Sequence, residues 1–176
     1  MNAKQEKILK MSKVLDTLTK IGAIVSIISI LFSLVVAIIA PSLDLTRFTV
    51  QEALGNSRFD ESVEEFRTIM LTGILSAAVI SAIFFVTSFI FKDMSQGTTP
   101  FTTKNANRLR VISLLIIALS VVIPPLQMLL TMIFLPSVRV YFPIELGPVV
   151  FAVMFFCLAH IFEYGAELQR ESDETL

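Results

Sequence analysis

The stretch IGAIVSIISILFSLVVAIIA, residues 21–40, contains no Asp, Glu, Lys or Arg. An apolar helix of about 20 residues rises about 30 Å, which matches the hydrocarbon core of a bilayer. Three further stretches also lack these charged residues: residues 69–91, 111–135 and 146–162. The sequence therefore predicts four transmembrane helices, and an all-α, polytopic membrane protein folded as a four-helix bundle.

The composition agrees with four spans. Of the 176 residues, 55% are hydrophobic and 16% are charged, whereas soluble domains have about 25% charged residues. Little chain is left between the spans, so we expect one membrane domain over residues 1–176. The single cysteine, Cys157, excludes an intrachain disulfide and a CxxC redox pair. The first stretch is also longer than the roughly 7–15 apolar residues of a signal peptide, so we expect it to stay in the membrane.

The positive charges indicate the orientation. Ten of the fourteen Lys and Arg lie before the first span, between the second and third spans, or after the fourth. The other four lie in the two remaining loops. The positive-inside rule therefore predicts that both termini are cytoplasmic and that the protein lies in the cell membrane.

The loop at residues 41–68 is predicted to lie outside the cell. Thr49 with Glu52, and Ser62 with Glu65, have the spacing of capping boxes, so we expect short helical pieces in this loop. Acidic residues outnumber arginines there. We interpret the loop as a solvated lid over the bundle, with a receptor loop or a cation-binding loop as the alternative.

Small residues recur every four positions in the first two spans. Such residues let helix backbones approach closely in a membrane, where no hydrophobic effect drives association. We therefore predict that they face a neighbouring helix and do not line a ligand path. They are Ser29, Ser33 and Ala37, and Gly73, Ala77 and Ser81.

Two adjacent prolines, Pro124 and Pro125, interrupt the third span. Proline has no backbone N–H and its ring collides with the carbonyl one turn earlier, so we expect a kink or a break. The kink could serve as a gate or be only a bend. Because no span carries Asp, Glu, Lys or Arg, we do not expect proton or ion coupling.

No motif of a known enzyme class is present, so we expect no catalytic activity and no cofactor. His160 precedes Glu163 by one helical turn and Glu167 by two, a spacing that could contribute metal ligands. Metal sites in bundles draw ligands from several helices, however, and no other histidine exists. We therefore interpret His160 as a polar residue where the fourth helix leaves the membrane, and expect no metal site.

The connection before the third span carries a helix start signal. Thr102 is a plausible N-cap, and we predict a helix that runs from it through Arg108 and Arg110 into the third span.

The tail at residues 163–176 is predicted to continue the fourth span as an amphipathic helix. Glu163 and Glu167 are like charges one turn apart, which is unfavourable unless a positive charge lies nearby. We therefore predict that one of them lies near Arg108 or Arg110.

Two short segments resemble a known family. They read Pro-Phe-x-x-x-Asn-x-x-x-Leu-Arg before the third span and Gly-x-x-Leu-x-x-Glu-x-Asp-Glu-Thr after the fourth. In these motifs the chain resembles an uncharacterised bacterial family of four-span membrane proteins, a domain-of-unknown-function family. The resemblance implies no reaction, and it implies a gene neighbour that is a small Cro/CI-type helix-turn-helix regulator. The matching residues are Pro100, Phe101, Asn105, Leu109, Arg110, Gly165, Leu168, Glu171, Asp173, Glu174 and Thr175.

The favoured functional hypothesis is a non-enzymatic membrane protein that presents a cytoplasmic surface to a soluble regulator. A second copy of the chain is the other protein partner considered, besides the lipid bilayer, and direct binding of nucleic acid is not expected. The alternative is a small transporter, channel or toxin-immunity protein that works through its spans. The predicted interaction surface consists of Asn105, Arg108, Arg110, Glu163, Glu167 and Asp173.

Overall fold

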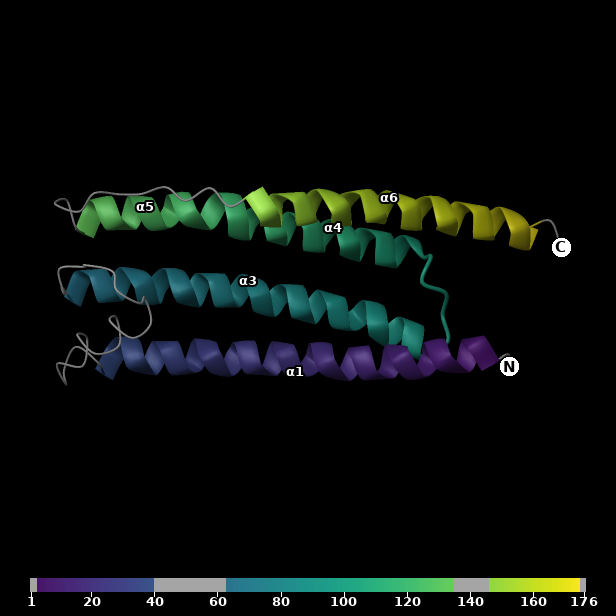
Figure 1. Cartoon of the computed structure of the whole chain (residues 1–176), viewed down its shortest axis with the longest axis horizontal. Helices are drawn as coiled ribbons and strands as arrows, with labels where there is room; N and C mark the ends of the chain where they lie inside the picture. The colour runs from purple at the N-terminus through teal and green to yellow at the C-terminus, as the bar shows by residue number, and fades with distance from the viewer. Residues whose placement is uncertain (1–2, 40–62, 135–145, 175–176) are drawn as a thin grey trace.

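The computed structural model describes residues 3–39, 63–134 and 146–174, which form long helices and one turn (Figure 1). Helix α4, the π-helical turn η2 and α5 follow one another and build one span. Four helices are long and apolar enough to cross a membrane, so the chain is an all-α, multi-pass membrane protein, as predicted. The elements are α1 (Ala3–Ile39), α3 (Val63–Ser95), α4 (Thr103–Ile117), η2 (Ala118–Val122), α5 (Ile123–Phe134) and α6 (Leu146–Glu174).

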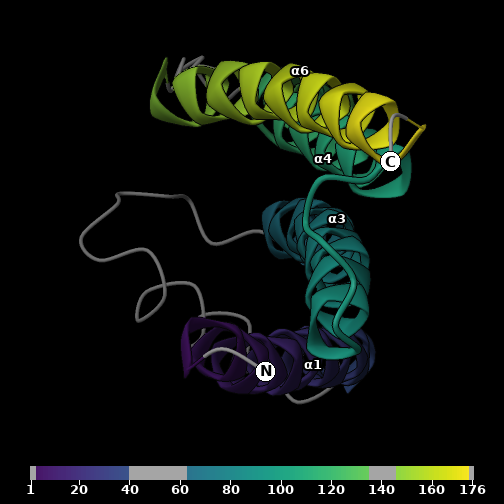
Figure 2. The same cartoon turned by 90° about the vertical axis from the view of Figure 1, so that its right-hand side faces the viewer.

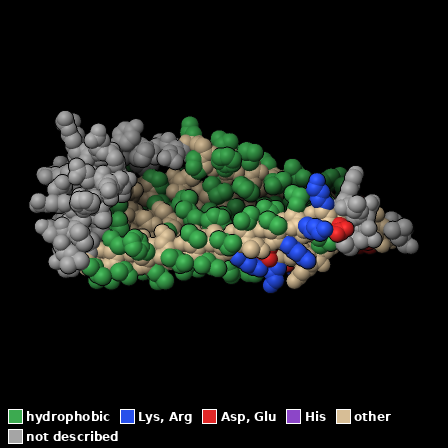
Figure 3. Space-filling view, turned by 60° about the horizontal axis from the view of Figure 1, so that its bottom comes forward, with side chains coloured by type: hydrophobic (Ala, Val, Ile, Leu, Met, Phe, Trp, Pro, Cys, Tyr) green, Lys and Arg blue, Asp and Glu red, His purple; other side chains and the backbone are tan. Residues whose placement is uncertain are grey.

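Large apolar side chains cover the outside of the helices. Phe32 and Ile38, for example, are 70% and 74% exposed. Figure 3 shows hydrophobic side chains along the molecule, and among the side chains that are described, the charged ones in this view gather at one end. We call this the charged end: α1 begins there, α6 ends there, and the chain turns there from α3 to α4. An apolar surface of this extent requires lipid as its solvent.

The helices form an open, curved row. Helix α1 packs along α3, α4 packs along α6, and α3 also contacts α4 and α5. Figure 2 shows α1 and α6 at the two ends of the row, with α3 and α4 between them. Helices α1 and α6 therefore each have one main neighbour within the chain.

A buried hydrophobic cluster lies where α3, α4 and α6 meet. It consists of Ile90, Leu109, Ile112 and Ala159. This cluster is close to the charged end, and it supports the polar side chains described below.

Helix α1 packs closely against α3 at Gly22, where an added Cβ would lie 2.9 Å from the Phe84 ring. Ala23 beside it is buried. Ser29 is exposed, and an added Cβ at Gly73 would meet nothing within 4 Å, so the prediction that these two residues face a neighbouring helix is wrong. Small residues occupy several faces of α1, and a four-residue spacing alone does not select the face that meets α3.

The two prolines are accommodated by η2. The Ile123 N–H donates to the Ala118 carbonyl, five residues earlier, and the Ser120 hydroxyl donates to the Ile116 carbonyl over 2.7 Å. Such a π-helical turn moves the carbonyls away from a following proline ring. The predicted disturbance of the span is therefore a π-helical turn within a continuous helix.

Two helices begin well before the predicted spans. Helix α1 begins at Ala3 and α3 begins at Val63, so residues 63–68 of the predicted outer loop form the first part of α3. The predicted capping boxes at Thr49 and Ser62 rest on residues that lie outside the described part of the chain.

Candidate functional site

The turn between α3 and α4 closes the charged end with a defined geometry. The Thr98 N–H donates to the Asp93 carbonyl over 3.3 Å, and the Gly97 N–H donates to the Met94 carbonyl over 3.1 Å. These are the two hydrogen bonds of a Schellman motif, which requires a residue in the left-handed region. Gly97 supplies it with a φ of +89°. Helix α3 therefore ends at a fixed position.

Helix α4 begins at the cap that the sequence predicts. The Asn105 N–H donates to the Thr102 hydroxyl oxygen over 3.2 Å. The Asn105 side chain reaches back into the turn, where its Nδ2 donates to the Pro100 carbonyl over 3.1 Å. Asn105 has no exposed surface, so this amide is a structural part of the turn.

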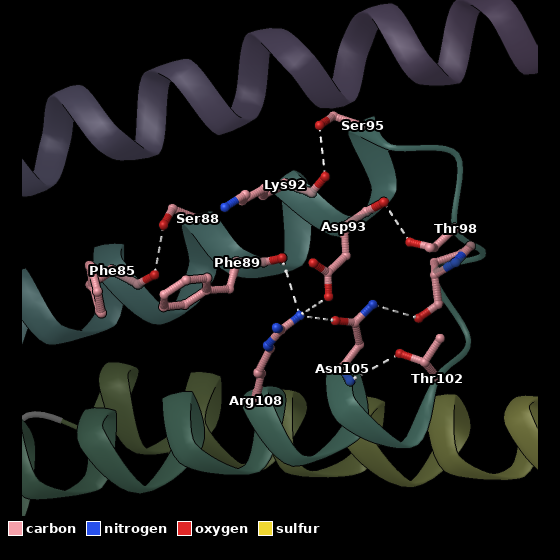
Figure 4. Close-up of polar contacts among 11 residues, drawn as sticks. Phe85, Ser88, Phe89, Lys92, Asp93, Ser95, Thr98, Thr102, Asn105 and Arg108 are labelled. Atoms are coloured by element: carbon pink, nitrogen blue, oxygen red, sulfur yellow. Dashed lines mark hydrogen bonds and ion pairs between the residues drawn. The ribbon is translucent and has the colours of Figure 1, made fainter.

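Arg108 joins α4 to α3, as Figure 4 shows. Its Nη1 lies 2.5 Å from Asp93 Oδ2, 2.8 Å from Asn105 Oδ1 and 3.1 Å from the Phe89 carbonyl. The guanidinium also lies over the Phe89 ring, 5.5 Å from its centroid. We call Asp93, Asn105 and Arg108 the polar clamp. Its charges cancel, and its hydrogen bonds connect the two helices.

A second set of contacts joins α6 to the beginning of α4. Arg110 Nη2 bonds to Glu163 Oε2, which confirms the prediction that an acidic residue of the tail lies near one of these arginines. The Phe101 and Phe162 rings lie 5.2 Å apart, and the Thr99 hydroxyl donates to Gln169 Oε1 over 2.9 Å. These contacts fix the direction in which α6 leaves the membrane-spanning region.

A family model described as a protein of unknown function, DUF2975, matches residues 54–176. The chain belongs to this family. The match covers α3 to α6, and with them the polar clamp and the Arg110–Glu163 pair, as the resemblance predicts, whereas α1 precedes it. No curated protein and no solved structure matches the chain.

The predicted interaction residues of this DUF2975 protein divide into three groups. Arg108, Arg110 and Glu163 bond to other side chains within the chain. Asn105 is buried, which corrects its assignment to an exposed surface. Glu167 and Asp173 are exposed on α6.

The last turns of α6 project beyond the ends of α3 and α4 (Figure 1). This part of α6 continues the fourth span without a break to Glu174, as predicted. The exposed carboxylates on it lie near one another along the helix and make it strongly negative. We call them the acidic tip: Glu167, Glu171, Asp173 and Glu174.

His160 lies beside the second set of contacts. Its ring packs against Phe156, with centroids 5.0 Å apart, and its Nδ1 is 3.7 Å from Glu163 Oε2. The same carboxylate oxygen binds Arg110. Within residues 3–39, 63–134 and 146–174, no group of three or more His, Cys, Asp or Glu side chains is placed to hold a metal ion.

Sequence reasoning missed Asp93, the residue that pairs with Arg108. A signal for it exists, because Asp93 is the only acidic residue between Lys92 and Arg110. An arginine two helical turns into α4 can reach back to the end of α3 only if the connection is short. The connection here is seven residues, from Gln96 to Thr102.

Proposed function

We propose that this DUF2975 protein is a non-enzymatic membrane adaptor, which holds a soluble regulatory protein at the cytoplasmic face of the cell membrane. The observation that carries the proposal is the acidic tip, which projects from the charged end while its base is held by Arg110 and Thr99. A rigid base lowers the entropy lost when a partner docks.

The charge of the tip indicates the chemistry of the partner. Residues 163–174 contain five acidic residues and one arginine. Such a surface attracts a basic protein and repels nucleic acid. Small DNA-binding proteins present a basic face to the phosphates of DNA, so the Cro/CI-type regulator implied by the family resemblance has a complementary surface.

The remaining polar groups support a role without catalysis. The polar clamp satisfies its members internally, with Arg108 bonded to both Asp93 and Asn105. A catalytic group needs to reach a substrate, whereas these side chains hold the turn between α3 and α4.

The first prediction concerns recruitment. We expect a fluorescent fusion of a Cro/CI-type regulator, the gene neighbour that the family resemblance implies, to lie at the membrane and to become diffuse when the four acidic-tip residues are changed to Gln or Asn. Loss of four exposed charges should weaken binding by about tenfold or more. Microscopy of cells expressing equal amounts of each variant measures this.

The matched control exchanges Glu171→Asp and Asp173→Glu, which keeps every charge, and should leave the regulator at the membrane. Neutralisation should not change insertion, because no acidic-tip residue bonds to another helix among the contacts described. A regulator that stays at the membrane with the neutralised tip, or is diffuse with the unaltered protein, would contradict the proposal.

The second prediction concerns orientation. In a Cys157→Ala background, we expect Ser57→Cys to react with an impermeant thiol reagent in intact cells and Gln96→Cys to react only after permeabilisation. The reason is that ten of the fourteen Lys and Arg lie on the side of the two termini, whereas four lie in the loops of the opposite side. Gln96 is exposed at the charged end, and Ser57 belongs to the predicted outer loop, outside the described residues. The opposite labelling pattern would place the acidic tip outside the cell and rule out a cytoplasmic partner.

The alternative function is a small transporter, channel or toxin-immunity protein. The turn η2 favours it, since π-helical turns within α-helices frequently occur at functional sites. Such a protein would act through its spans, so neutralising the acidic tip would leave its activity intact.

A further inference from the structure

The part of α1 near the charged end carries an apolar stripe that is not covered by any helix in the described part of the chain. Met11, Val14 and Leu18 are between 55% and 59% exposed. Their spacing of three and four residues places them on one side of the helix. Ser12 and Ala23, by contrast, are buried on the side that packs against α3. The stripe therefore points away from the rest of the row.

Helix α6 carries a matching stripe at the same end. Ile161, Tyr164 and Leu168 are 59%, 63% and 48% exposed, again three and four residues apart. The buried residues of α6, Ala152 and Ala159, lie on the side toward α4. Both end helices thus present an apolar stripe opposite their neighbour within the chain.

Lipid does not account for the outermost part of either stripe. Met11 lies between Lys10 and Lys13 in the sequence, and Leu168 lies between Glu167 and Arg170. Charged residues at this density mark chain that has left the hydrocarbon core. Apolar side chains at such a level face water unless a protein surface covers them.

The two segments are opposite in charge. Residues 3–20 of α1 contain five lysines and two acidic residues, and residues 163–174 of α6 contain five acidic residues and one arginine. In coiled coils, apolar residues three and four apart form the contact, and charges beside them select the partner and its orientation. The α1 and α6 stripes are complementary in this sense.

The segments lie at the same level but cannot meet within one chain. Gly22 lies against Phe84, and α1 and α3 run in opposite directions, so Asp93 is level with about Lys13. The polar clamp then links α3 to α4, and the Arg110 pair links α4 to Glu163. Helices α1 and α6 nevertheless stand at opposite ends of the curved row (Figure 2).

We propose that α1 of one copy of this protein packs against α6 of a second copy, through the apolar stripes and the flanking lysines and carboxylates. The two helices run antiparallel, because α1 leaves the charged end and α6 returns to it. The contact joins two different surfaces, and such contacts close into a ring when the rotation between copies divides a full turn. The smallest ring of this kind is a dimer with two α1–α6 contacts. This contact shares Glu167 and Glu171 with the acidic tip, the proposed docking surface for a regulator, so its test is made in the absence of the regulator.

The test is cross-linking between two differently tagged chains in a Cys157→Ala background, in membranes of cells that lack the adjacent regulator. One chain carries Met11→Cys and the other Ile161→Cys. A disulfide needs Cα atoms within about 7 Å. We expect oxidation to join the two tags. The control replaces Ile161→Cys by Asn107→Cys, an exposed position on α4, and should give no such product.

Reversing the charges on both helices distinguishes a specific α1–α6 contact from random collision and from misfolding of a variant. Lys7→Glu with Lys10→Glu on the first chain should lower the cross-linked fraction by about fivefold or more, because exposed attractive pairs become repulsive. Adding Glu167→Lys with Glu171→Lys to the second chain should restore the cross-link. Recovery in the doubly altered pair shows that both chains still fold.

Three results would overturn the proposal. The first is equal cross-linking of Met11→Cys to Asn107→Cys, which indicates random collision. The second is failure of the charge exchange to restore the product. The third is absence of cross-linking while Met11→Cys is protected from thiol reagents, which would show that another protein covers α1.

Discussion

Replacing Asn105 by leucine is expected to lower the midpoint of thermal unfolding in detergent by about 5 to 10 °C. The side chain has no exposed surface, donates to the Pro100 carbonyl and accepts from the charged Arg108. Leucine has a similar volume but makes neither hydrogen bond, so the Pro100 carbonyl keeps only the Thr102 N–H as a donor and Arg108 loses one acceptor. Loss of the two hydrogen bonds should lower the free energy of unfolding by about 2 to 3 kcal/mol. In a chain of this size, each kcal/mol lowers the unfolding midpoint by about 2 to 4 °C.

The control for this prediction is Asn107→Leu, on the same helix. Asn107 is exposed and bonds only to the Arg110 side chain among the contacts described. Its replacement should therefore change the free energy of unfolding by less than about 0.5 kcal/mol. Hydrogen exchange should locate the effect, with faster exchange at Thr98 and Asn105 in the Asn105 variant alone. Equal unfolding midpoints for the two variants would show that the clamp does not hold the turn.

Replacing Gly165 by leucine is expected to separate α6 from the turn before α4. An added Cβ at Gly165 would lie 2.8 Å from Phe101 Cδ1, 3.0 Å from its Cγ and 3.3 Å from its Cβ. The Cβ and Cγ atoms cannot move away by rotation of the ring, so the helices must move apart. Overpacking of this kind costs about 1 to 3 kcal/mol, and it should also break the bond between Thr99 and Gln169.

Two other glycines provide a graded comparison. At Gly22 the nearest atoms are outer ring atoms of Phe84, which can shift, so Gly22→Leu should be less damaging than Gly165→Leu. At Gly73 nothing lies within 4 Å of an added Cβ, and Gly73→Leu should leave stability unchanged or raise it, because leucine is the better helix former. Thermal unfolding of the three variants measures the order of their unfolding midpoints. A midpoint that is lowest for Gly73→Leu would show that α1, α3 and α6 pack differently.

The spans of this protein were predictable because their signal is local. A stretch such as residues 21–40 needs no knowledge of its neighbours to be recognised as a transmembrane helix. The cap at Thr102 and the pairing of Glu163 with an arginine were predictable for a related reason. The cap depends on two residues three positions apart, and the pair follows from a need for charge balance at one end of the molecule.

The arrangement of the helices was not predictable from the same signals. Arg108 and Arg110 are equivalent in sequence, yet one bonds to Asp93 and the other to Glu163. Asn105 looks like a surface residue until the turn places it beneath Pro100. Which residues pair depends on how α3, α4 and α6 are rotated about their own axes. The sequences of apolar spans surrounded by lipid carry little information about this rotation.

The turn η2 has a consequence for the rotational phase of the third span. A π-helical turn contains one residue more than an α-helical turn, and each residue advances an α-helix by about 100°. The side chains of α5 are therefore rotated about the helix axis relative to a regular continuation of α4. Helix α4 packs along α6 and also contacts α3, whereas α5 contacts α3, so the two halves of one span have different sets of neighbours. Deleting a single residue between Ala118 and Val122 would leave the hydropathy of the span unchanged and would still turn the α3-facing side of α5 toward lipid.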